Sequence, residues 1–231
     1  MDPACGSGHI LVYAFDLLAH IYRERGYAER DIPGLILEHN LHGLDIDERA
    51  AQLASFAVTM KARELNSRLF RKPPSLNVLQ VKPTRGLALP RTGGRDLLGN
   101  HASLSGGLTD LDAFNPNDWQ PLVDAFADAD HLGSLITPPA FDAERLRAQL
   151  DGLKRRGGFD AQGLEELKHL LKQAELLARK YDAVVANPPY MGGGSFSIEL
   201  KDFFESHYLE GKADLFSVFM QKCLELSKPT G

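Results

Sequence analysis

The sequence predicts an α/β fold built on a parallel sheet, and three observations support this prediction. Stretches with the helical period alternate with short apolar runs of the strand type, and turns rich in Gly, Asp or Asn separate them. The links are short, which favours parallel strands connected by helices. The chain has 231 residues, 43% of them hydrophobic and 25% charged, which is a globular composition with enough length for one full domain.

The N-terminal part is expected to supply a turn, a helix, a strand and a second long helix. A glycine-rich turn at residues 2–8 leads into a helix over residues 9–25, and a short helix is expected around 32–39. Residues 41–45 are a strand candidate, after which Asp47 is placed to cap a helix. The first helix would bury Ile10, Leu11, Ala14, Phe15, Leu18, Ile21 and Tyr22, and the capped one Ala50, Leu53, Ala54, Ala57, Val58 and Leu65.

The C-terminal part is expected to continue this alternation after an inserted segment. Residues 76–81 are another strand candidate, and Gly, Pro, Ser and Asp then dominate until about residue 140, which indicates little regular structure. Helices are expected at 143–154 and 164–181, and an apolar strand at 182–186. Beyond the flexible glycines 192–194, a last amphipathic helix carries Leu215, Phe216, Phe219, Met220, Cys223 and Leu226.

Both ends of the chain are expected to be cut edges of a larger sheet. Residues 1–3 begin where a turn should leave a central strand, and residues 228–231 resemble the exit from a helix toward a further strand. We therefore expect a fold that is incomplete at both ends. We also expect the chain alone to be poorly folded or to have little activity.

Composition and charge exclude several classes of protein. No stretch approaches the roughly 20 apolar residues that cross a bilayer, and no signal peptide is present, so a cytoplasmic protein is expected. Cys5 and Cys223 have no metal-type spacing. The net charge of −5 argues against a free-standing nucleic-acid binder, although nine Lys or Arg residues lie in 61–95 and nine acids in 96–144. We interpret the two segments as solvated loops rather than as a DNA-binding surface.

The turn at residues 2–8 and the acid at the end of the strand expected at 41–45 suit a nucleotide-like cofactor. Gly6 and Gly8 let the backbone approach a ligand, while the helix N-terminus offers free N–H groups. Such turns also occur for packing reasons, and this one lacks the three-glycine spacing of dinucleotide sites. Asp45 could accept two hydrogen bonds from a ribose diol, or it could simply end its strand.

The sequence Asn187-Pro188-Pro189-Tyr190 is the most specific motif. It follows an apolar run, where ligands bind in open sheets, and its prolines fix the backbone. An amino group on an aromatic ring is a weak nucleophile because its lone pair is delocalised. The Asn187 side-chain oxygen and the Pro188 carbonyl could accept its two N–H bonds, with Tyr190 stacked on the ring. The alternative is a rigid surface turn with a buried tyrosine.

Together these motifs resemble those of the amino-group DNA methyltransferases in which the cofactor motif comes first. Residues 9–16 and 47–53 are similar to the large PglX-type adenine methyltransferases of BREX phage-exclusion systems. The resemblance implies a Rossmann-like S-adenosylmethionine-dependent methyltransferase fold. It implies a cofactor-binding part at 1–84, an insertion with loop and helices at 85–180, and a catalytic part of the same domain at 181–231.

The implied reaction is methylation of adenine N6 at specific DNA sites, in a restriction-modification or phage-defence system. Four residues would line the methionine part of S-adenosylmethionine: Asp2, Ala4, Gly6 and Gly8. Asp45 would hold the ribose and Ile46 would pack on the cofactor adenine. A target adenine flipped out of double-stranded DNA would be held by Asn187, Pro188, Pro189 and Tyr190. Residues 212–216 resemble a segment beside the cofactor pocket. No metal is needed, and other phage-defence proteins are possible partners.

The sequence differs from the family pattern at one place, and two alternative functions are compatible with it. Residues 80–82, Gln-Val-Lys, stand where the family places an Asp or Asn that binds the cofactor's adenine amino group. The Asn-Pro-Pro-Tyr motif also occurs in methyltransferases that act on protein glutamine or on ribosomal RNA guanine, but their cofactor loop typically differs from residues 2–8, which favours DNA adenine. Finally, the chain could be a non-catalytic remnant of a split gene, which would not bind the cofactor.

Overall fold

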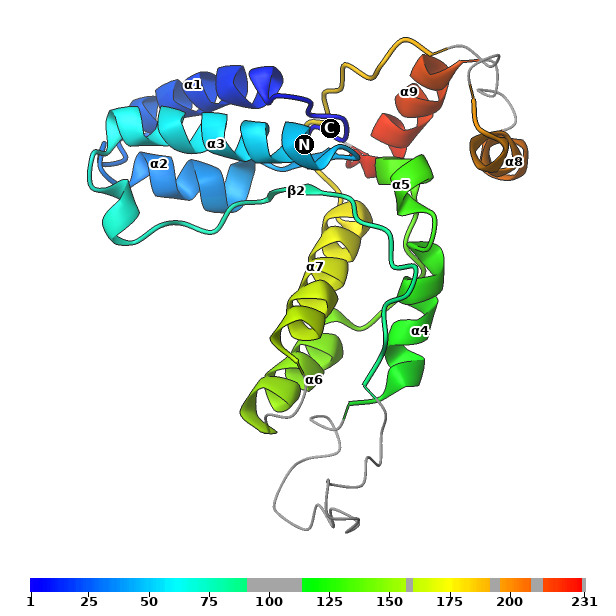
Figure 1. Cartoon of the computed structure of the whole chain (residues 1–231). Helices are drawn as coiled ribbons and strands as arrows, with labels where there is room; N and C mark the ends of the chain where they lie inside the picture. The colour runs from blue at the N-terminus through cyan, green and yellow to red at the C-terminus, as the bar shows by residue number, and fades with distance from the viewer. Residues whose placement is uncertain (91–113, 157–159, 192–195, 209–213, 230–231) are drawn as a thin grey trace.

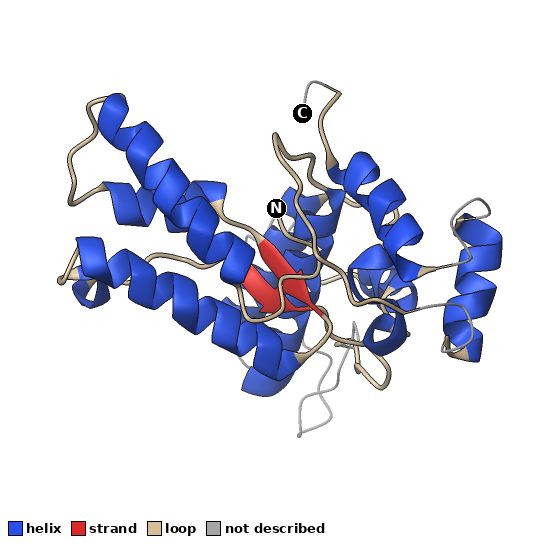
Figure 2. Ribbon diagram, turned by 90° about the horizontal axis from the view of Figure 1, so that it is seen from above, coloured by secondary structure: helices blue, strands red, loops and turns tan. Residues whose placement is uncertain are grey.

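The computed structural model describes residues 1–90, 114–156, 160–191, 196–208 and 214–229. Figure 1 shows helices α1, α2 and α3 lying together on one side and α8 and α9 on the other, while α4, α6 and α7 extend away from both. A small parallel sheet lies among the helices (Figure 2). The predicted parallel strands are therefore present, but the described part of the chain is mostly helical and its sheet is smaller than expected.

The sheet has one regular pair of strands. Strands β1 (Gly43–Asp45) and β2 (Val78–Gln80) pair in parallel, with Gly43 opposite Val78. On the other side of β1, Asp2 forms a parallel bridge with Gly43. The Asp2 N–H donates to the His42 carbonyl at 2.9 Å, and the Leu44 N–H donates to the Asp2 carbonyl at 2.9 Å. The strand candidates at 41–45 and 76–81 thus form, with shorter bounds.

The N-terminal segment lies between β1 and the apolar run before the Asn-Pro-Pro-Tyr motif. The Met1 amino group donates to the Ala183 carbonyl at 2.9 Å, and the Val185 N–H donates to the Met1 carbonyl at 2.9 Å. Tyr181 forms a further parallel bridge with Ser227. The extended segments therefore follow the order 78–80, 43–45, 1–2, 181–185 and 227.

The strand expected at 182–186 is not a regular strand in this arrangement. Its backbone is extended but bonds only at isolated points. The neighbouring segment offers few partners because Pro3 has no N–H and the turn begins there. The apolar sequence predicted a strand, but none of residues 182–186 is buried and Val185 is 52% exposed. The sequence could not show how short the neighbouring segment would be.

The helices predicted in the N-terminal part form at their expected positions, and a short helix at Leu69–Arg71 was not anticipated. The helices of this part are α1 (His9–Glu24), α2 (Ile32–Leu35), the π-helix η1 (Ile36–Asn40), α3 (Glu48–Leu65) and the short η2 (Leu69–Arg71). The Asp47 side chain accepts a hydrogen bond from the Ala50 N–H at 2.9 Å, so the predicted cap forms. Helices α1, α2 and α3 pack around a core that includes Phe15 and Val58.

The buried faces of α1 and α3 differ in part from the prediction. Helix α3 buries Ala51, Ala54, Val58 and Ala62. Leu53, which was expected on that face, is 52% exposed, and Ile21 of α1 is also exposed. Small side chains on the buried face let α3 lie close to its neighbours, so the larger apolar side chains point outward.

Gly8 is one position where this close packing requires glycine. Its φ is +85°, and a Cβ there would lie 2.9 Å from both Cα and Cβ of Ala54. We expect Gly8→Ala to lower the free energy of unfolding by at least about 2 kcal/mol, because it adds backbone strain and a clash between α1 and α3. Urea denaturation measures this. Gly34→Ala is the control, because nothing lies within 4 Å of its added Cβ; an equal loss in both variants would contradict the argument.

The middle of the chain forms a helical arm. Its elements are α4 (Pro116–Ala125), α5 (Ala129–Leu132), η4 (Gly133–Leu135), α6 (Ala143–Arg156) and α7 (Ala161–Ala178). Trp119 is buried, and its Nε1–H donates to the Gln149 side chain at 2.9 Å. The expectation of little regular structure before residue 140 is therefore wrong for 116–135. Asn115 caps α4 and Pro116 occupies its first turn, so residues that suggested a loop begin a helix instead.

Helices α8 (Ile198–His207) and α9 (Leu215–Leu226) form a separate apolar cluster with Leu135. Helix α9 confirms the expected last helix, whereas α8 was not anticipated. The glycines 192–194 lie outside the described residues. Within the described part of the chain, no helix is both long and apolar enough to cross a membrane.

Candidate cofactor and substrate site

A cavity of about 430 Å³ lies where the predicted motifs meet. Small-molecule sites usually measure about 300 to 1,000 Å³. The predicted residues that line it are Ala4, Gly6, Asp45, Ile46, Asn187 and Pro189. The remaining lining residues are Pro3, His131, Leu132, Gly133, Ser134, Leu135, Met191, Leu200, Leu215 and Phe219. The fold thus brings the glycine-rich loop, the acid that ends β1 and the Asn-Pro-Pro-Tyr motif to a single cavity at the carboxyl end of β1.

Asp45 is held in place by backbone donors on both sides. Its Oδ2 accepts from the Gly6 N–H at 2.8 Å and its Oδ1 accepts from the Asp47 N–H at 2.9 Å. Each carboxylate oxygen has a second lone pair. Because Asp45 also lines the cavity, those lone pairs can accept hydrogen bonds from a ligand's hydroxyl groups.

Asp2 is buried beside this loop without lining the cavity. It is 1% exposed, and its Oδ1 accepts from the Ala4 N–H at 3.1 Å. Its Oδ2 has no hydrogen-bond partner among the residues that the structure describes. Burial raises the pKa of this carboxyl to about 6, although the bond from Ala4 opposes the shift. A positively charged ligand near the loop would therefore stabilise the ionised form.

The raised pKa of Asp2 makes stability depend on pH. The folded-state pKa of about 6 exceeds the value of 3.8 expected without burial, so the folded protein binds the proton more tightly. The stability that protonated Asp2 contributes to the folded protein is fully present below about pH 4 and is lost as the pH rises through about 6. The free energy of unfolding of Asp2→Asn, relative to the parent, should therefore rise across this window by up to about 3 kcal/mol.

Urea denaturation of both proteins between about pH 4 and pH 8 measures this difference. Asp182→Asn is the control, because the hydrogen bond from Lys228 lowers the pKa of that exposed carboxyl. Its variant should show no such rise. A constant difference between Asp2→Asn and the parent across the whole window would contradict the raised pKa.

The Asn-Pro-Pro-Tyr motif is divided between the cavity and its surroundings. Asn187 and Pro189 line the cavity. Pro188 is buried outside the lining, and Tyr190 is 88% exposed at the surface. Just after the motif, the Met191 carbonyl accepts from the Leu215 N–H at 3.1 Å, which ties the motif to α9. Leu215, in the segment expected beside the pocket, lines the cavity too.

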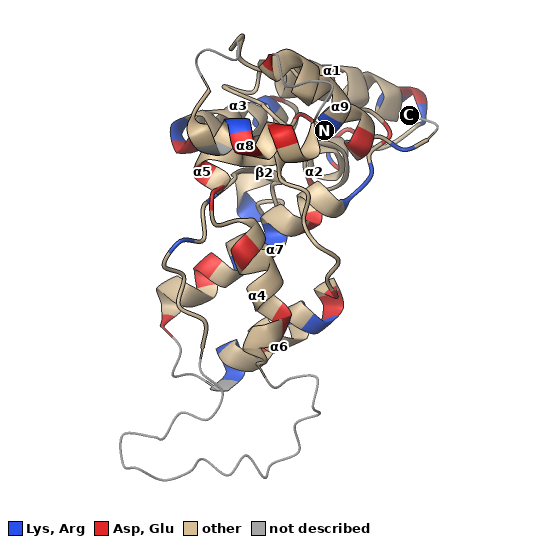
Figure 3. Cartoon of the chain, turned by 90° about the vertical axis from the view of Figure 1, so that its right-hand side faces the viewer, with Lys and Arg blue, Asp and Glu red and all other residues tan. Residues whose placement is uncertain are grey.

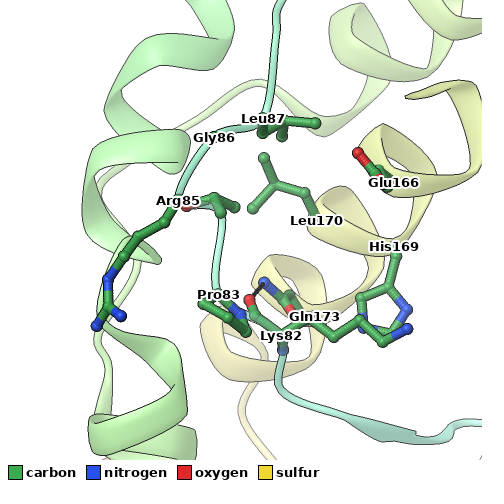
Figure 4. Close-up of a pocket in the computed structure, with 10 residues that line it drawn as sticks. Lys82, Pro83, Arg85, Gly86, Leu87, Glu166, His169, Leu170 and Gln173 are labelled. Atoms are coloured by element: carbon green, nitrogen blue, oxygen red, sulfur yellow. Dashed lines mark hydrogen bonds between the residues drawn. The ribbon is translucent and has the colours of Figure 1, made fainter.

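Residues 80–82 are turned away from this cavity. Figure 4 shows Lys82 and Gln173 side by side at a separate cavity of about 250 Å³. The Lys82 N–H donates to Gln173 Oε1 at 2.9 Å, and Gln173 Nε2 donates to the Lys82 carbonyl at 3.1 Å. Gln80 donates to the Ile46 carbonyl at 3.1 Å through its side chain. The chain after β2 is thus fixed to α7 and does not line the larger cavity.

No motif indicated that residues 131–135 line the cavity, as they do in the structure. The Ser134 hydroxyl donates to the Pro3 carbonyl. Gly133 has a φ of +53°, and a Cβ added there would lie 3.5 Å from the Ile46 side chain. The Gly-Ser pair indicates a tight turn. No local pattern shows which distant loop such a turn will cover.

The basic and acidic segments meet in the structure. Arg85 lies in the first and forms ion pairs with Asp128 and Asp130 of the second, at 2.7 and 2.9 Å. Figure 3 shows Lys and Arg mixed with Asp and Glu over much of the visible ribbon. At Arg85 the two segments therefore neutralise one another, while residues 91–113 lie outside the described part.

Comparisons with known proteins add to this geometry. Residues 39–231 match the family model described as Eco57I restriction-modification methylase. The chain is 41% identical over 243 residues to "Adenine-specific methyltransferase BrxX" of Escherichia coli O9:H4 (strain HS). It is 36% identical over 239 residues to "Adenine-specific methyltransferase PglX" of Lacticaseibacillus casei (strain Zhang). Both alignments cover 100% of this chain but only 20% and 19% of the relatives, so the chain spans about a fifth of their length.

Proposed function

Because the chain belongs to the Eco57I restriction-modification methylase family, we propose that it holds the cofactor-binding and catalytic parts of a DNA methyltransferase. The enzyme transfers a methyl group from S-adenosylmethionine to N6 of adenine in double-stranded DNA, in a restriction-modification or phage-defence system. The observation that carries the proposal is the cavity shared by the glycine-rich loop, Asp45 and Asn187. The names of the two relatives support adenine as the acceptor.

The fold proposed with this function is the Rossmann-like methyltransferase fold. The order of the extended segments, 78–80, 43–45, 1–2, 181–185 and 227, supports it. It corresponds to the doubly wound order 3-2-1-4-5, in which ligands bind where the direction of winding reverses. The division into a cofactor part at 1–84, an insertion at 85–180 and a catalytic part at 181–231 belongs to the same proposal.

The residues around the cavity fit S-adenosylmethionine. The free lone pairs of Asp45 suit the ribose hydroxyl groups, and Ile46 offers an apolar surface to the adenine. The loop with Ala4, Gly6 and Gly8 lies beside the methionine end, and the unpartnered Oδ2 of Asp2 suits a nearby positive charge. When bound, the cofactor supplies a methyl group on a positively charged sulfur.

The Asn-Pro-Pro-Tyr motif at 187–190 positions the amino group of the target adenine, which accepts the methyl group. Asn187 and Pro189 line the cavity, so the Asn187 side-chain oxygen can accept one N–H bond of an adenine amino group. The carbonyl of Pro188, which stands between these two residues, would accept the other. These bonds hold the nitrogen lone pair toward the methyl group and stabilise the positive charge that develops on the nitrogen. Tyr190, exposed at the surface, is free to stack on a base flipped out of the duplex.

A chimera tests the proposal. In it, this chain replaces the matching fifth of the Escherichia coli relative, and the protein is incubated with labelled S-adenosylmethionine and unmethylated DNA. We expect N6-methyladenine when the nucleosides are identified by mass spectrometry. Cofactor binding without any methylated base would favour a protein or RNA acceptor. No cofactor binding by the folded chimera would favour the non-catalytic remnant.

A further inference from the structure

We propose that residues 131–135 form the wall that receives the adenine end of the cofactor, with His131 as the side chain that recognises the purine. This inference rests on the proposed function and extends it, because it assigns a binding role to a segment of the helical arm. It concerns α5 and η4, which reach the cavity from a part of the chain that is far from both sequence motifs.

The position of Asp45 determines where the purine lies. If Asp45 holds the ribose, the base extends toward the next residue, Ile46, which also lines the cavity. A Cβ added to Gly133 would lie 3.5 Å from the Ile46 side chain, so the turn approaches Ile46 within van der Waals distance. The turn and Ile46 therefore form one continuous wall of the cavity, and the purine lies against this wall.

The chain after β2 is not available for this role. Gln80 donates to the Ile46 carbonyl, and both backbone groups of Lys82 are bonded to Gln173 on α7. His169 is bonded to the Gln80 carbonyl at 2.8 Å. Residues 80–82 do not line the cavity. A polar group that recognises the purine must come from another element.

His131 is the polar side chain that remains for the purine. Among the described residues that line the cavity, Asp45 is assigned to the ribose and Asn187 to the acceptor adenine. The Ser134 hydroxyl is buried and donates to Pro3. The His131 side chain is 39% exposed. Its ring can donate from one nitrogen and accept at the other, which matches the amino group and ring nitrogen of adenine.

The turn is held at both ends, which keeps this wall in place. Before it, Arg85 donates to Asp128 and Asp130 at the start of α5. Within it, Ser134 is bonded to the Pro3 carbonyl of the glycine-rich loop. A recognition group on such a fixed element loses little freedom when the ligand binds.

Equilibrium binding of S-adenosylmethionine to the chain tests the inference. We expect His131→Ala to weaken binding by about five- to tenfold, the effect of one lost hydrogen bond. Gly133→Ala should also weaken it, because its Cβ enters the space beside Ile46. His20→Ala is the control, because this histidine is exposed on α1 and does not line the cavity. Circular dichroism establishes that each variant is folded.

Nuclear magnetic resonance of histidine-labelled protein distinguishes a His131 ring that contacts the cofactor from one that only supports the structure of the turn. The His131 ring signal, assigned with a His131→Gln variant, should move on addition of S-adenosylmethionine or adenosine and stay in place with methionine. The inference is wrong if the parent binds the cofactor, Asp45→Ala abolishes binding, and neither His131→Ala nor the His131 signal changes. In that case the proposed function stands. If neither the folded parent chain nor the chimera binds the cofactor, the proposed function fails and the inference fails with it.

Discussion

Replacing Asn187 by alanine is expected to lower the rate of N6-adenine methylation by the chimera at least about a hundredfold. The variant loses the side-chain oxygen that accepts an N–H bond of the target amino group, so the nitrogen lone pair is no longer directed at the methyl group. Binding of S-adenosylmethionine should stay within about twofold of the parent, because Asn187 acts on the acceptor and not on the cofactor. Single-turnover methylation and equilibrium binding measure the two quantities separately.

Asn117→Ala is the matched control for this variant. Asn117 is exposed on α4 and does not line the cavity, so its removal should leave the methylation rate unchanged. A second variant, Asn187→Asp, keeps an acceptor oxygen and should retain more activity than Asn187→Ala. Full activity of Asn187→Ala would show that the motif is a rigid surface turn and would remove it from the proposed mechanism.

Replacing Asp45 by alanine is expected to weaken S-adenosylmethionine binding at least about a hundredfold, measured by calorimetry on the chain itself. Two losses combine in this variant. The acceptor for the ribose hydroxyl groups disappears, and the N–H groups of Gly6 and Asp47 lose the carboxylate that accepts their bonds. The glycine-rich loop is then no longer held beside β1 by that carboxylate.

Two further variants show how specific this effect is. Asp45→Asn keeps one acceptor oxygen and should bind about tenfold more weakly than the parent, between the parent and Asp45→Ala. Asp47→Asn should bind normally, because Asn caps a helix as well as Asp does and the residue does not line the cavity. If Asp45→Ala remains folded and binds as the parent does, Asp45 only ends its strand.

Local features of the fold could be predicted because their causes are local. The cap at Asp47 and the helical period of α1 depend on residues only a few positions apart, and both predictions are confirmed. Helix α4 was missed because Pro116 and Asn115 are common in loops as well as at helix N-termini. These residues are compatible with a loop or with a helix N-terminus. The helix is decided by the burial of Trp119 against other parts of the chain, which the local sequence does not show.

The composition of the cavity could be predicted only for the elements that carry motifs. Asp45 and Asn187 stand at the ends of apolar runs, and a parallel sheet brings such ends to one edge. The covering turn at 133–135 comes from a helical arm whose docking depends on contacts such as Ser134 with Pro3. No spacing within the sequence encodes a contact over that separation. The roles of the individual residues stay predictions until the binding experiments are made.

The central place of Met1 in the sheet has a consequence for folding kinetics. Met1 is bonded to Ala183 across 182 positions of sequence, so the middle of the sheet closes only after residue 183 has been synthesised. Loops of that length close slowly, and proteins rich in such contacts fold slowly for their stability. Until closure, the edge of residues 1–2 that faces Ala183 is unpaired and can bind other strands. Refolding yield should therefore fall as the protein concentration is raised.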